Sequence, residues 1–285
     1  MTGPLEGPSF ALASGLAYGV SDFVGGIASR KVAALRVVLV SYPVAMVLLA
    51  VLALVVGGDI SRGAVVWGAL CGVSQAFGVW WFYAALGSGP ISVVSPLTAV
   101  IVAGVPVGVG LALGERPGAV ATAGVALALV AVVLVSRQSA SPDAAALPFT
   151  PKVAWLTLGS GVAFGLNFVL IDQAPAEAGL WPLVFARVTA TVLVLVIAVV
   201  SRNLRAPTGT PLRLALLAGV LDTGANVAML LALQASLLSL AGVLMSLYPA
   251  ATMVLAIVVL RERVTRWQVV GMVAALAAVA MIAGG

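Results

Sequence analysis

Long uncharged apolar runs constrain the fold of this chain more than any other feature. Stretches of about 20 apolar residues follow one another along almost the whole sequence. A membrane-crossing helix needs about 20 such residues, because the hydrocarbon core of a bilayer is about 30 Å thick. Strands of a membrane β-barrel are about half as long and alternate between apolar and polar residues, which these runs do not. The pattern therefore predicts an all-α integral membrane protein.

Ten runs can be delimited. The uncharged stretch 63–114 is too long for one span, and the turn sequence Gly87-Ser88-Gly89-Pro90 divides it into two. The other runs cover residues 10–29, 37–58, 117–136, 153–171, 179–201, 212–233, 237–260 and 267–283. We therefore expect ten transmembrane helices.

Composition excludes several classes of function. Only 8% of the residues are charged and 62% are hydrophobic, whereas a soluble domain carries about 25% charged residues. The 14 basic and 9 acidic residues are scattered through short loops, unlike the clustered basic surface of a nucleic-acid-binding protein. The chain has no histidine, one cysteine and no nucleotide-binding loop. No metal, cofactor, nucleic acid or direct use of ATP is expected.

The sequence contains an internal repeat. A shift of 147 residues superposes residues 68–135 on 215–282 without a gap. The uncommon residues that coincide are Gly72 with Gly219, Gly124 with Gly271, and Glu115-Arg116 with Glu262-Arg263. At a shift of 146 residues, SGLAYGVS (14–21) matches SGVAFGLN (160–167).

The longest polar segment, residues 138–152, lies at the midpoint of the chain. We interpret it as a linker between a first five-helix repeat, residues 1–137, and a second, residues 153–285. Because five is odd, the two repeats must cross the membrane in opposite orientations around a central cavity, as in many secondary transporters.

The repeated motifs resemble a known family. The paired S-G-x-A-[Y/F]-G segments, S-L-Y-P-x-x-T (Ser246–Thr252) and the two L-x-E-R closures are similar to those of the ten-helix EamA-like branch of the drug/metabolite transporter superfamily. The resemblance implies a basket of helices around a substrate cavity, with the fifth and tenth helices more peripheral. It also implies export of amino acids, metabolites or drugs. One departure is that Pro96 and Pro106 stand in the first half where the second has Tyr248-Pro249.

Two carboxylates inside predicted spans are the strongest functional candidates. Asp222 lies near the middle of the eighth span and Asp22 about two-thirds through the first. A charged Asp at mid-bilayer costs about 2.5–3.5 kcal/mol on insertion scales, so such residues usually face a polar interior. They would exchange protons or bind a cation. The alternative is a structural carboxylate satisfied by hydroxyls or paired with Arg187. The repeat places apolar Phe168 opposite Asp22 and polar Gln75 opposite Asp222.

Further polar residues extend these two positions. Tyr18 shares a helix face with Asp22, and Asn226 shares one with Asp222, because residues four apart are neighbours on a helix. Asn167 adds an amide on the sixth span. These side chains would line a cavity wall, or else form hydrogen bonds between helices, worth about 0.6 kcal/mol on average.

Aromatic residues gather on the third span as Trp80, Trp81 and Tyr83. A ring in the cavity could stack on a flat or cationic solute, and the alternative is an aromatic belt at the membrane interface. Trp80 and Trp81 point in directions about 100° apart, so both cannot face the cavity. Trp81 and Tyr83 are the candidates for the lining ring.

Prolines are expected to interrupt the fourth and ninth spans. Pro96, Pro106 and Pro249 each lack an N–H donor and disturb the carbonyl four residues earlier. Freed carbonyls are tolerated beside a water-filled cavity, although simple packing kinks are an alternative. The polar neighbours that become site candidates are Ser95, Thr98, Ser246 and Tyr248.

The remaining features have structural interpretations. The glycines of the two S-G-x-A-[Y/F]-G segments are spaced for close helix packing. Glu115-Arg116 is expected to anchor a helix end at the interface. Arg187, about six residues inside its span, is expected to reach the surface by snorkelling.

The basic residues are unevenly distributed between the two sides. Two basic residues, Arg62 and Arg116, lie in even-numbered loops. Eleven lie in odd-numbered loops: Arg30, Lys31, Arg36, Arg137, Lys152, Arg202, Arg205, Arg213, Arg261, Arg263 and Arg266. By the positive-inside rule the odd loops are cytoplasmic and both termini outside, whereas the family resemblance favours termini inside.

We therefore predict a multi-pass protein of the cell (inner or plasma) membrane that moves a small organic solute. A proton-coupled exporter working by alternating access is the first hypothesis, and a passive facilitator or channel is the alternative. A membrane enzyme acting on lipid-linked substrates would need a catalytic cluster that the sequence lacks. The expected partners are a small-molecule substrate and the lipid bilayer; the oligomeric state is left open, with a monomer as the working expectation.

Overall fold

The computed structural model describes residues 6–29, 31–88, 91–136, 149–260 and 265–284, and every regular element within them is helical. The helices are α1 (Glu6–Ser29), α2 (Ala34–Val56), α3 (Arg62–Ser88), α4 (Ile91–Ala112), α5 (Ala119–Ser136), α6 (Pro151–Asp172), η1 (Ala176–Ala178), α7 (Trp181–Val200), α8 (Thr210–Ala235), α9 (Leu238–Met245), α10 (Tyr248–Leu260) and α11 (Arg266–Gly284). Each predicted apolar run is helical, and the ninth run is divided between α9 and α10.

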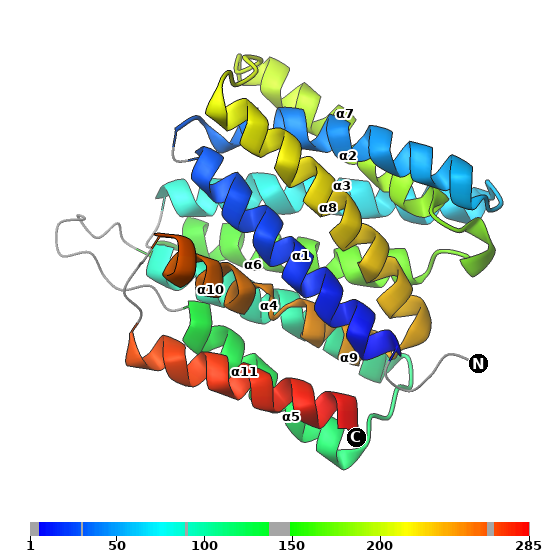
Figure 1. Ribbon diagram of the computed structural model, residues 1–285, viewed down its shortest axis with the longest axis vertical. Helices are drawn as coiled ribbons and strands as arrows, with labels where there is room; N and C mark the ends of the chain where they lie inside the picture. The colour runs from blue at the N-terminus through cyan, green and yellow to red at the C-terminus, as the bar shows by residue number, and fades with distance from the viewer. Residues whose placement is uncertain (1–5, 30, 89–90, 137–148, 261–264, 285) are drawn as a thin grey trace.

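Six of these helices, α1, α2, α3, α6, α7 and α8, are long and apolar enough to cross a membrane. Shorter apolar segments lie in α4, α5 and α11. The helices run back and forth as a bundle, in which α2 and α7 lie at one edge and α5 and α11 pack together at the other (Figure 1).

Local sequence fixes several helix ends. Thr150 caps α6: its side chain accepts a hydrogen bond from the backbone N–H of Val153, and Pro151 occupies the first turn. At the end of α2, Gly57 has φ of 80°, a left-handed conformation that favours glycine.

The prediction that prolines interrupt two spans is correct for the ninth and wrong for the fourth. The helix α4 continues through Pro96 and Pro106. The ring of Pro106 instead packs against Gly242 of α9, where a Cβ atom would lie only 2.5 Å from the ring. Between α9 and α10 the break falls just before Tyr248-Pro249, so that Pro249 lies in the first turn of α10, where a missing N–H breaks no helical hydrogen bond.

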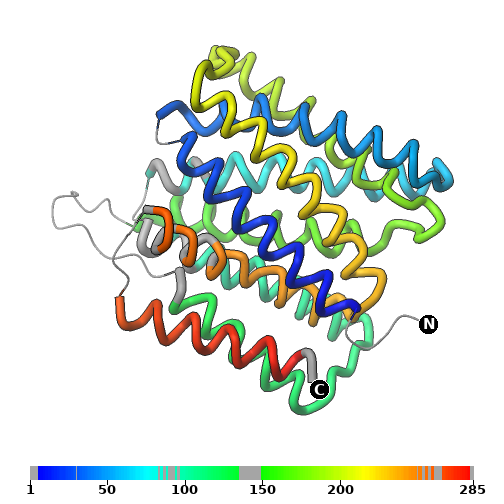
Figure 2. Tube along the Cα trace, in the orientation of Figure 1, coloured from blue at the N-terminus to red at the C-terminus, as the bar shows by residue number. Residues whose placement is uncertain are grey.

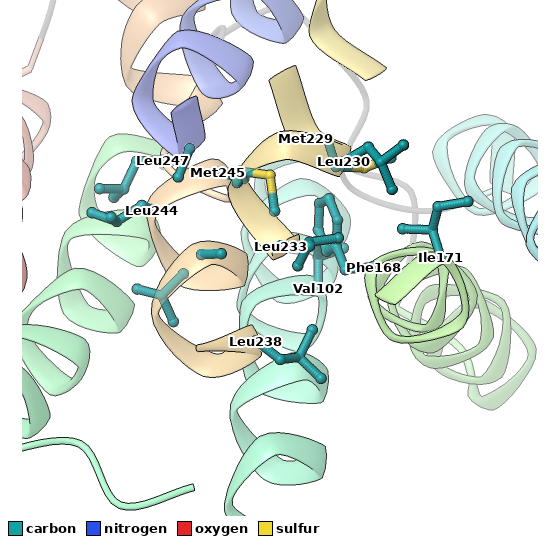
Figure 3. Packing of buried hydrophobic residues seen from close by; sticks show 14 of the residues in the cluster. Val102, Phe168, Ile171, Met229, Leu230, Leu233, Leu238, Leu244, Met245 and Leu247 are labelled. Carbon is teal, nitrogen blue, oxygen red and sulfur yellow. The ribbon is translucent and has the colours of Figure 1, made fainter. Parts of the chain in front are cut away.

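Helices from the two halves of the chain are interleaved. The helix α1 packs against α8 on one side and against α9 and α10 on the other, and α6 packs in the same way against α3 and α4. The trace in Figure 2 shows α1, in blue, lying along α8, in yellow, although they come from opposite halves. The apolar core therefore draws on both halves; Val102, Phe168, Met229 and Leu244 are among the buried side chains that meet there (Figure 3).

Hydrogen bonds between residues at or near helix ends join the two halves at both ends of the bundle. At the end with most basic residues, Arg36 Nε donates to Asn203 Oδ1 at 2.8 Å. At the opposite end, the backbone N–H of Asp59 donates to the carbonyl oxygen of Glu177 at 2.9 Å.

Glu115 forms a further connection between the halves at that opposite end. Its carboxylate accepts hydrogen bonds from the backbone N–H groups of Leu238 and Ser239, at 2.6 and 3.0 Å. A carboxylate is stabilised there because the N-terminus of a helix carries unpaired N–H groups and a partial positive charge. Glu115 therefore caps α9, which is more specific than the interfacial anchoring expected from the sequence.

Candidate functional site

The relative position of the two membrane aspartates follows from the packing of α1 against α8. Ser14 Oγ donates to the carbonyl oxygen of Ala225 at 2.9 Å, and Ser21 Oγ donates to that of Ala218 at 3.0 Å. The helices are therefore antiparallel. Asp22 lies about five residues, or roughly 7 Å, along the helix axis from the level of Asp222.

Asp222 forms a buried ion pair with Arg187. The Nη2 and Oδ2 atoms are 2.6 Å apart, and the side chains are 3% (Arg187) and 21% (Asp222) exposed. The guanidinium also lies over the ring of Tyr42, 4.6 Å from its centroid, as in a cation–π interaction. The prediction that Arg187 snorkels to the surface is wrong, because a carboxylate and a ring hold its charge in the interior.

Asn226 supports this ion pair from one turn further along α8. Its Nδ2 donates to the backbone carbonyl oxygen of Asp222 at 2.7 Å, and its side chain is buried. The two residues therefore share a face of α8, as their spacing predicted.

Asp22 has a different environment. Its side chain is exposed, whereas the adjacent Ser21 is buried against α8. Within the described part of the chain, no hydrogen bond or ion pair to its carboxylate is formed. It interacts electrostatically with Asp222, Tyr42 and Tyr248, which lie on α8, α2 and α10. Asp22 therefore differs from Asp222, which is paired with Arg187.

Asn167 is satisfied by the neighbouring helix α3. Its Nδ2 donates to Cys71 Sγ at 3.1 Å, and Cys71 Sγ lies 3.7 Å from the carbonyl oxygen of Asn167. Both residues are buried. One turn further along α3, Gln75 Oε1 is buried and accepts no hydrogen bond from the described residues.

Comparison with known proteins assigns the chain to a family. The sequence model of the EamA-like transporter family matches residues 5–137 and 151–284. The chain belongs to this family. Its members are membrane transporters of small solutes and not enzymes.

A solved crystal structure has the same fold as this transporter. The superposition has a TM-score of 0.77 and covers 96% of this chain and 95% of the other, at 15% sequence identity. No curated protein matches the chain in sequence.

The remaining candidate residues of the transporter lie in several places. Tyr18 is partly buried, and its hydroxyl lies 3.6 Å from Met229 Sδ. Trp81 is partly buried and packs against Gly159 of α6, whereas Trp80 is 50% exposed. Tyr248, at the start of α10, is partly buried.

Two candidates near the prolines are buried and paired with groups of the protein. Thr98 Oγ1 lies 3.5 Å from Ser160 Oγ, and Ser246 Oγ donates to the carbonyl oxygen of Val243 at 2.8 Å. The side chains of Tyr83 and Ser95 lie outside the described residues.

Sequence reasoning missed Tyr42, which contacts the buried arginine. A Cβ atom added to Gly219 would lie 2.7 Å from the carbonyl oxygen of Ser41. In the same way, a Cβ atom added to Gly72 would overlap the carbonyl oxygen of Ala186. Ser41 and Ala186 are therefore equivalent positions in the two halves, which makes Tyr42 the equivalent of Arg187. Extending the repeat to the second and seventh spans, at a shift of 145, would have revealed it.

A small apolar pocket of about 80 Å³ lies between α2 and α7 of the transporter, beside Tyr42. Its lining residues are Val38, Leu39, Tyr42, Pro43, Thr191, Val194 and Leu195. Its position between two helices at one edge of the bundle differs from that of the predicted central cavity (Figure 1).

Proposed function

We propose that this transporter is a proton-coupled exporter of a small organic solute that works by alternating access. The two alternating units are inverted five-helix repeats, residues 1–137 and 153–285, and residues 138–152 link them. The proposal rests on the ion pair between Arg187 and Asp222 in the interior of the bundle. Asp22 and Asp222 are its coupling residues. Tyr18, Asn167, Asn226 and Tyr248 are its first-choice polar contacts.

Equivalent contacts in the two halves support the repeat. A Cβ atom added to Gly15 would lie 3.2 Å from the carbonyl oxygen of Met245. A Cβ atom added to Gly161 would lie 3.1 Å from the carbonyl oxygen of Thr98. These positions correspond at the sequence shifts of 146 and 147 residues. By the same shifts, the Ser21 contact with Ala218 corresponds to the Asn167 contact with Cys71. Two similar units related in this way have two equivalent arrangements, which is what alternating access requires.

The charged groups support solute coupling. Membrane-embedded carboxylates are rare and commonly mark proton or ion pathways. The charge of Asp222 is neutralised by Arg187. Protonation of the Asp222 carboxylate would remove its charge and so release Arg187. Asp22 has no cationic partner among the described residues and is free to exchange a proton or a solute cation.

Transport by purified protein in proteoliposomes tests the proposal. We expect saturable uptake and counterflow for at least one solute in a panel of amino acids, amines and drugs, and stimulation by an opposing pH gradient. Linear, non-saturating flux without counterflow would favour a passive facilitator. Saturable transport that ignores the pH gradient would remove the proton-coupling step.

The uneven charge distribution supports an orientation with the basic end in the cytoplasm and both termini outside, in the cell membrane. In a Cys71→Ser background, the exposed residues Ser201 and Glu177 provide labelling sites at opposite ends of the bundle. We expect an impermeant maleimide added to intact cells to label Glu177→Cys and not Ser201→Cys. The reverse labelling pattern would contradict this orientation.

A further inference from the structure

Three arginines lie where the turn between α1 and α2 meets the loop between α7 and α8. Arg36 belongs to the first turn of α2, and Arg202 and Arg205 belong to the loop that follows α7. Arg36 Nε donates a hydrogen bond to Asn203 Oδ1 at 2.8 Å, so the two segments are joined. Neither the turn nor the loop contains an acidic residue. The three positive charges are therefore held at one end of the α2–α7 pair.

The backbone at the end of α7 fixes the start of this loop. The N–H of Asn203 donates to the carbonyl oxygen of Ala198 at 2.8 Å, and the N–H of Arg202 donates to that of Val199 at 3.0 Å. These are the two hydrogen bonds of a Schellman motif, which ends a helix with a residue in the left-handed conformation. That residue is Arg202, with φ of 53°, although glycine adopts this conformation with less strain. The motif therefore places a positive charge beside Asn203 at a position where glycine is usual.

The apolar pocket between α2 and α7 begins close to these arginines. Its residue Val38 follows Arg36 by two positions on α2, or about 3 Å along the helix axis. Its residue Leu195 lies five positions before the end of α7 at Val200, or about 8 Å. The volume of about 80 Å³ is roughly half that of a cavity of about 150 Å³ that admits benzene. The pocket therefore has room for a short length of hydrocarbon chain and not for a whole organic solute.

The pocket lies on an outer side of the bundle. The helices α2 and α7 form one edge of the molecule (Figure 1). Leu195, which lines the pocket, is about half exposed, and so are Val192, Val196 and Val199 on the same helix. Lipid tails are as apolar as these side chains and cover such a surface in a membrane. An acyl chain lying along α7 therefore passes the pocket.

We propose that an anionic phospholipid binds here, with its phosphate at Arg36, Arg202 and Arg205 and a segment of one acyl chain in the pocket between α2 and α7. The guanidinium group of arginine binds phosphate oxygens through two parallel N–H donors. Arg36 uses Nε for Asn203, and its two Nη groups have no partner among the described residues. Basic sites between transmembrane helices are suited to anionic headgroups.

Tyr42 connects this lipid site with the interior of the transporter. Its side chain lines the pocket, and its ring centroid lies 4.6 Å from Arg187 Cζ. A chain in the pocket therefore contacts a residue that itself contacts the ion pair of Arg187 with Asp222. A lipid that binds the folded protein in this way stabilises it by mass action, so thermal unfolding reports its binding.

Lipid binding to the purified protein in detergent, measured by native mass spectrometry and thermal unfolding, tests the proposal. The probes are phosphatidylglycerol, zwitterionic phosphatidylcholine, and glycerol 3-phosphate, which carries a phosphate without acyl chains. We expect phosphatidylglycerol to bind at least tenfold more tightly than phosphatidylcholine, and this preference to decline with added salt. Equal binding of the two lipids would overturn the proposal. Glycerol 3-phosphate that stabilises the protein as much as phosphatidylglycerol would also overturn it, because the site would then bind free phosphate.

Arginine variants test the headgroup contacts. The triple variant Arg36→Gln, Arg202→Gln, Arg205→Gln should bind phosphatidylglycerol at least tenfold more weakly and phosphatidylcholine as before. Arg62→Gln, which removes an exposed arginine at the opposite end, is the control and should bind as the unmodified protein does. Unchanged phosphatidylglycerol affinity in the triple variant, or an equal loss in Arg62→Gln, would overturn the proposal.

Substitutions of Arg202 separate binding from folding. Arg202→Gly removes the charge but suits the left-handed backbone, so it should unfold no earlier than the unmodified protein in the absence of lipid. It should nevertheless bind phosphatidylglycerol at least twofold more weakly, and Arg202→Lys should retain more affinity than Arg202→Gly. Equal affinity of Arg202→Gly and the unmodified protein would remove this arginine from the site and contradict the proposal.

A matched pair of substitutions on α7 tests the pocket. Leu195→Trp enlarges a half-exposed side chain that lines the pocket, whereas Val192→Trp enlarges a half-exposed side chain that is not among its lining residues. Leu195→Trp should weaken phosphatidylglycerol binding at least threefold, and Val192→Trp should leave it unchanged. Equal affinities in the two variants would show that no acyl chain occupies the pocket and would overturn the proposal.

Discussion

The ion pair between Arg187 and Asp222 gives a quantitative test of the interior. Arg187→Gln removes the guanidinium and leaves the Asp222 carboxylate without a cation in a side chain only 21% exposed. At 2.6 Å, two unit charges attract by about 6 kcal/mol at an effective dielectric constant of about 20. Desolvation offsets part of this, and removing one partner of a buried pair typically costs about 3–5 kcal/mol. We expect a loss of that size in the free energy of unfolding.

A double-mutant cycle isolates the pairwise interaction. Arg187→Gln and Asp222→Asn should each be destabilising, whereas the double variant replaces two charges by two neutral amides. Its loss should therefore be smaller than the summed losses of the single variants, by at least about 2 kcal/mol. The measurement is reversible unfolding in mixed detergent micelles titrated with dodecyl sulfate.

Arg213→Gln provides the matched control, because Arg213 is exposed at the start of α8. Its effect should stay within about 0.5 kcal/mol. Additive losses in the cycle, or an Arg187→Gln variant as stable as Arg213→Gln, would refute the assignment of a stabilising interior ion pair.

Three other predictions concern the scaffold, each measured by thermal unfolding. Glu115→Gln should cost about 1–2 kcal/mol because the N-terminus of α9 loses its ionised cap, and a loss no larger than that of the exposed control Glu177→Gln would contradict this. Gly72→Ala should be destabilising by about 1–3 kcal/mol, because the added methyl group meets the α7 backbone. Gly104→Ala meets open space and should be neutral or stabilising by up to about 1 kcal/mol; equal effects at the two glycines would exclude the close approach. Thr150→Ala should cost about 1 kcal/mol through loss of the α6 cap, and an unchanged melting temperature would show that the cap contributes nothing.

Much of the fold could be predicted from the sequence, because the free energy of placing a segment in a membrane depends on that segment's own residues. Every predicted apolar run is helical, and the break in the ninth run follows from Pro249. The continuity of α4 could not be predicted, since it depends on Gly242 of α9 making room for Pro106.

The candidate site was predicted less completely. The sequence identified both aspartates and named Arg187 as an alternative partner of Asp222, but it favoured snorkelling for the arginine. It did not identify Tyr42, because the repeat is weak in the second and seventh spans. Nor could it show that Asp222 is paired with Arg187, whereas Asp22 has no ion-pair partner among the described residues.

The sequence alone determined the membrane class, the position of the apolar helices and the family, because hydrophobic length and short motifs are local properties. Tertiary structure decided which polar groups meet. That depends on the register and rotation of each helix against its neighbours, and close contacts at small residues such as Gly72 and Gly219 set both. A shift of one residue rotates a helical side chain by about 100°, enough to separate Asp222 from Arg187, so the charge balance of the interior is a property of the assembled bundle.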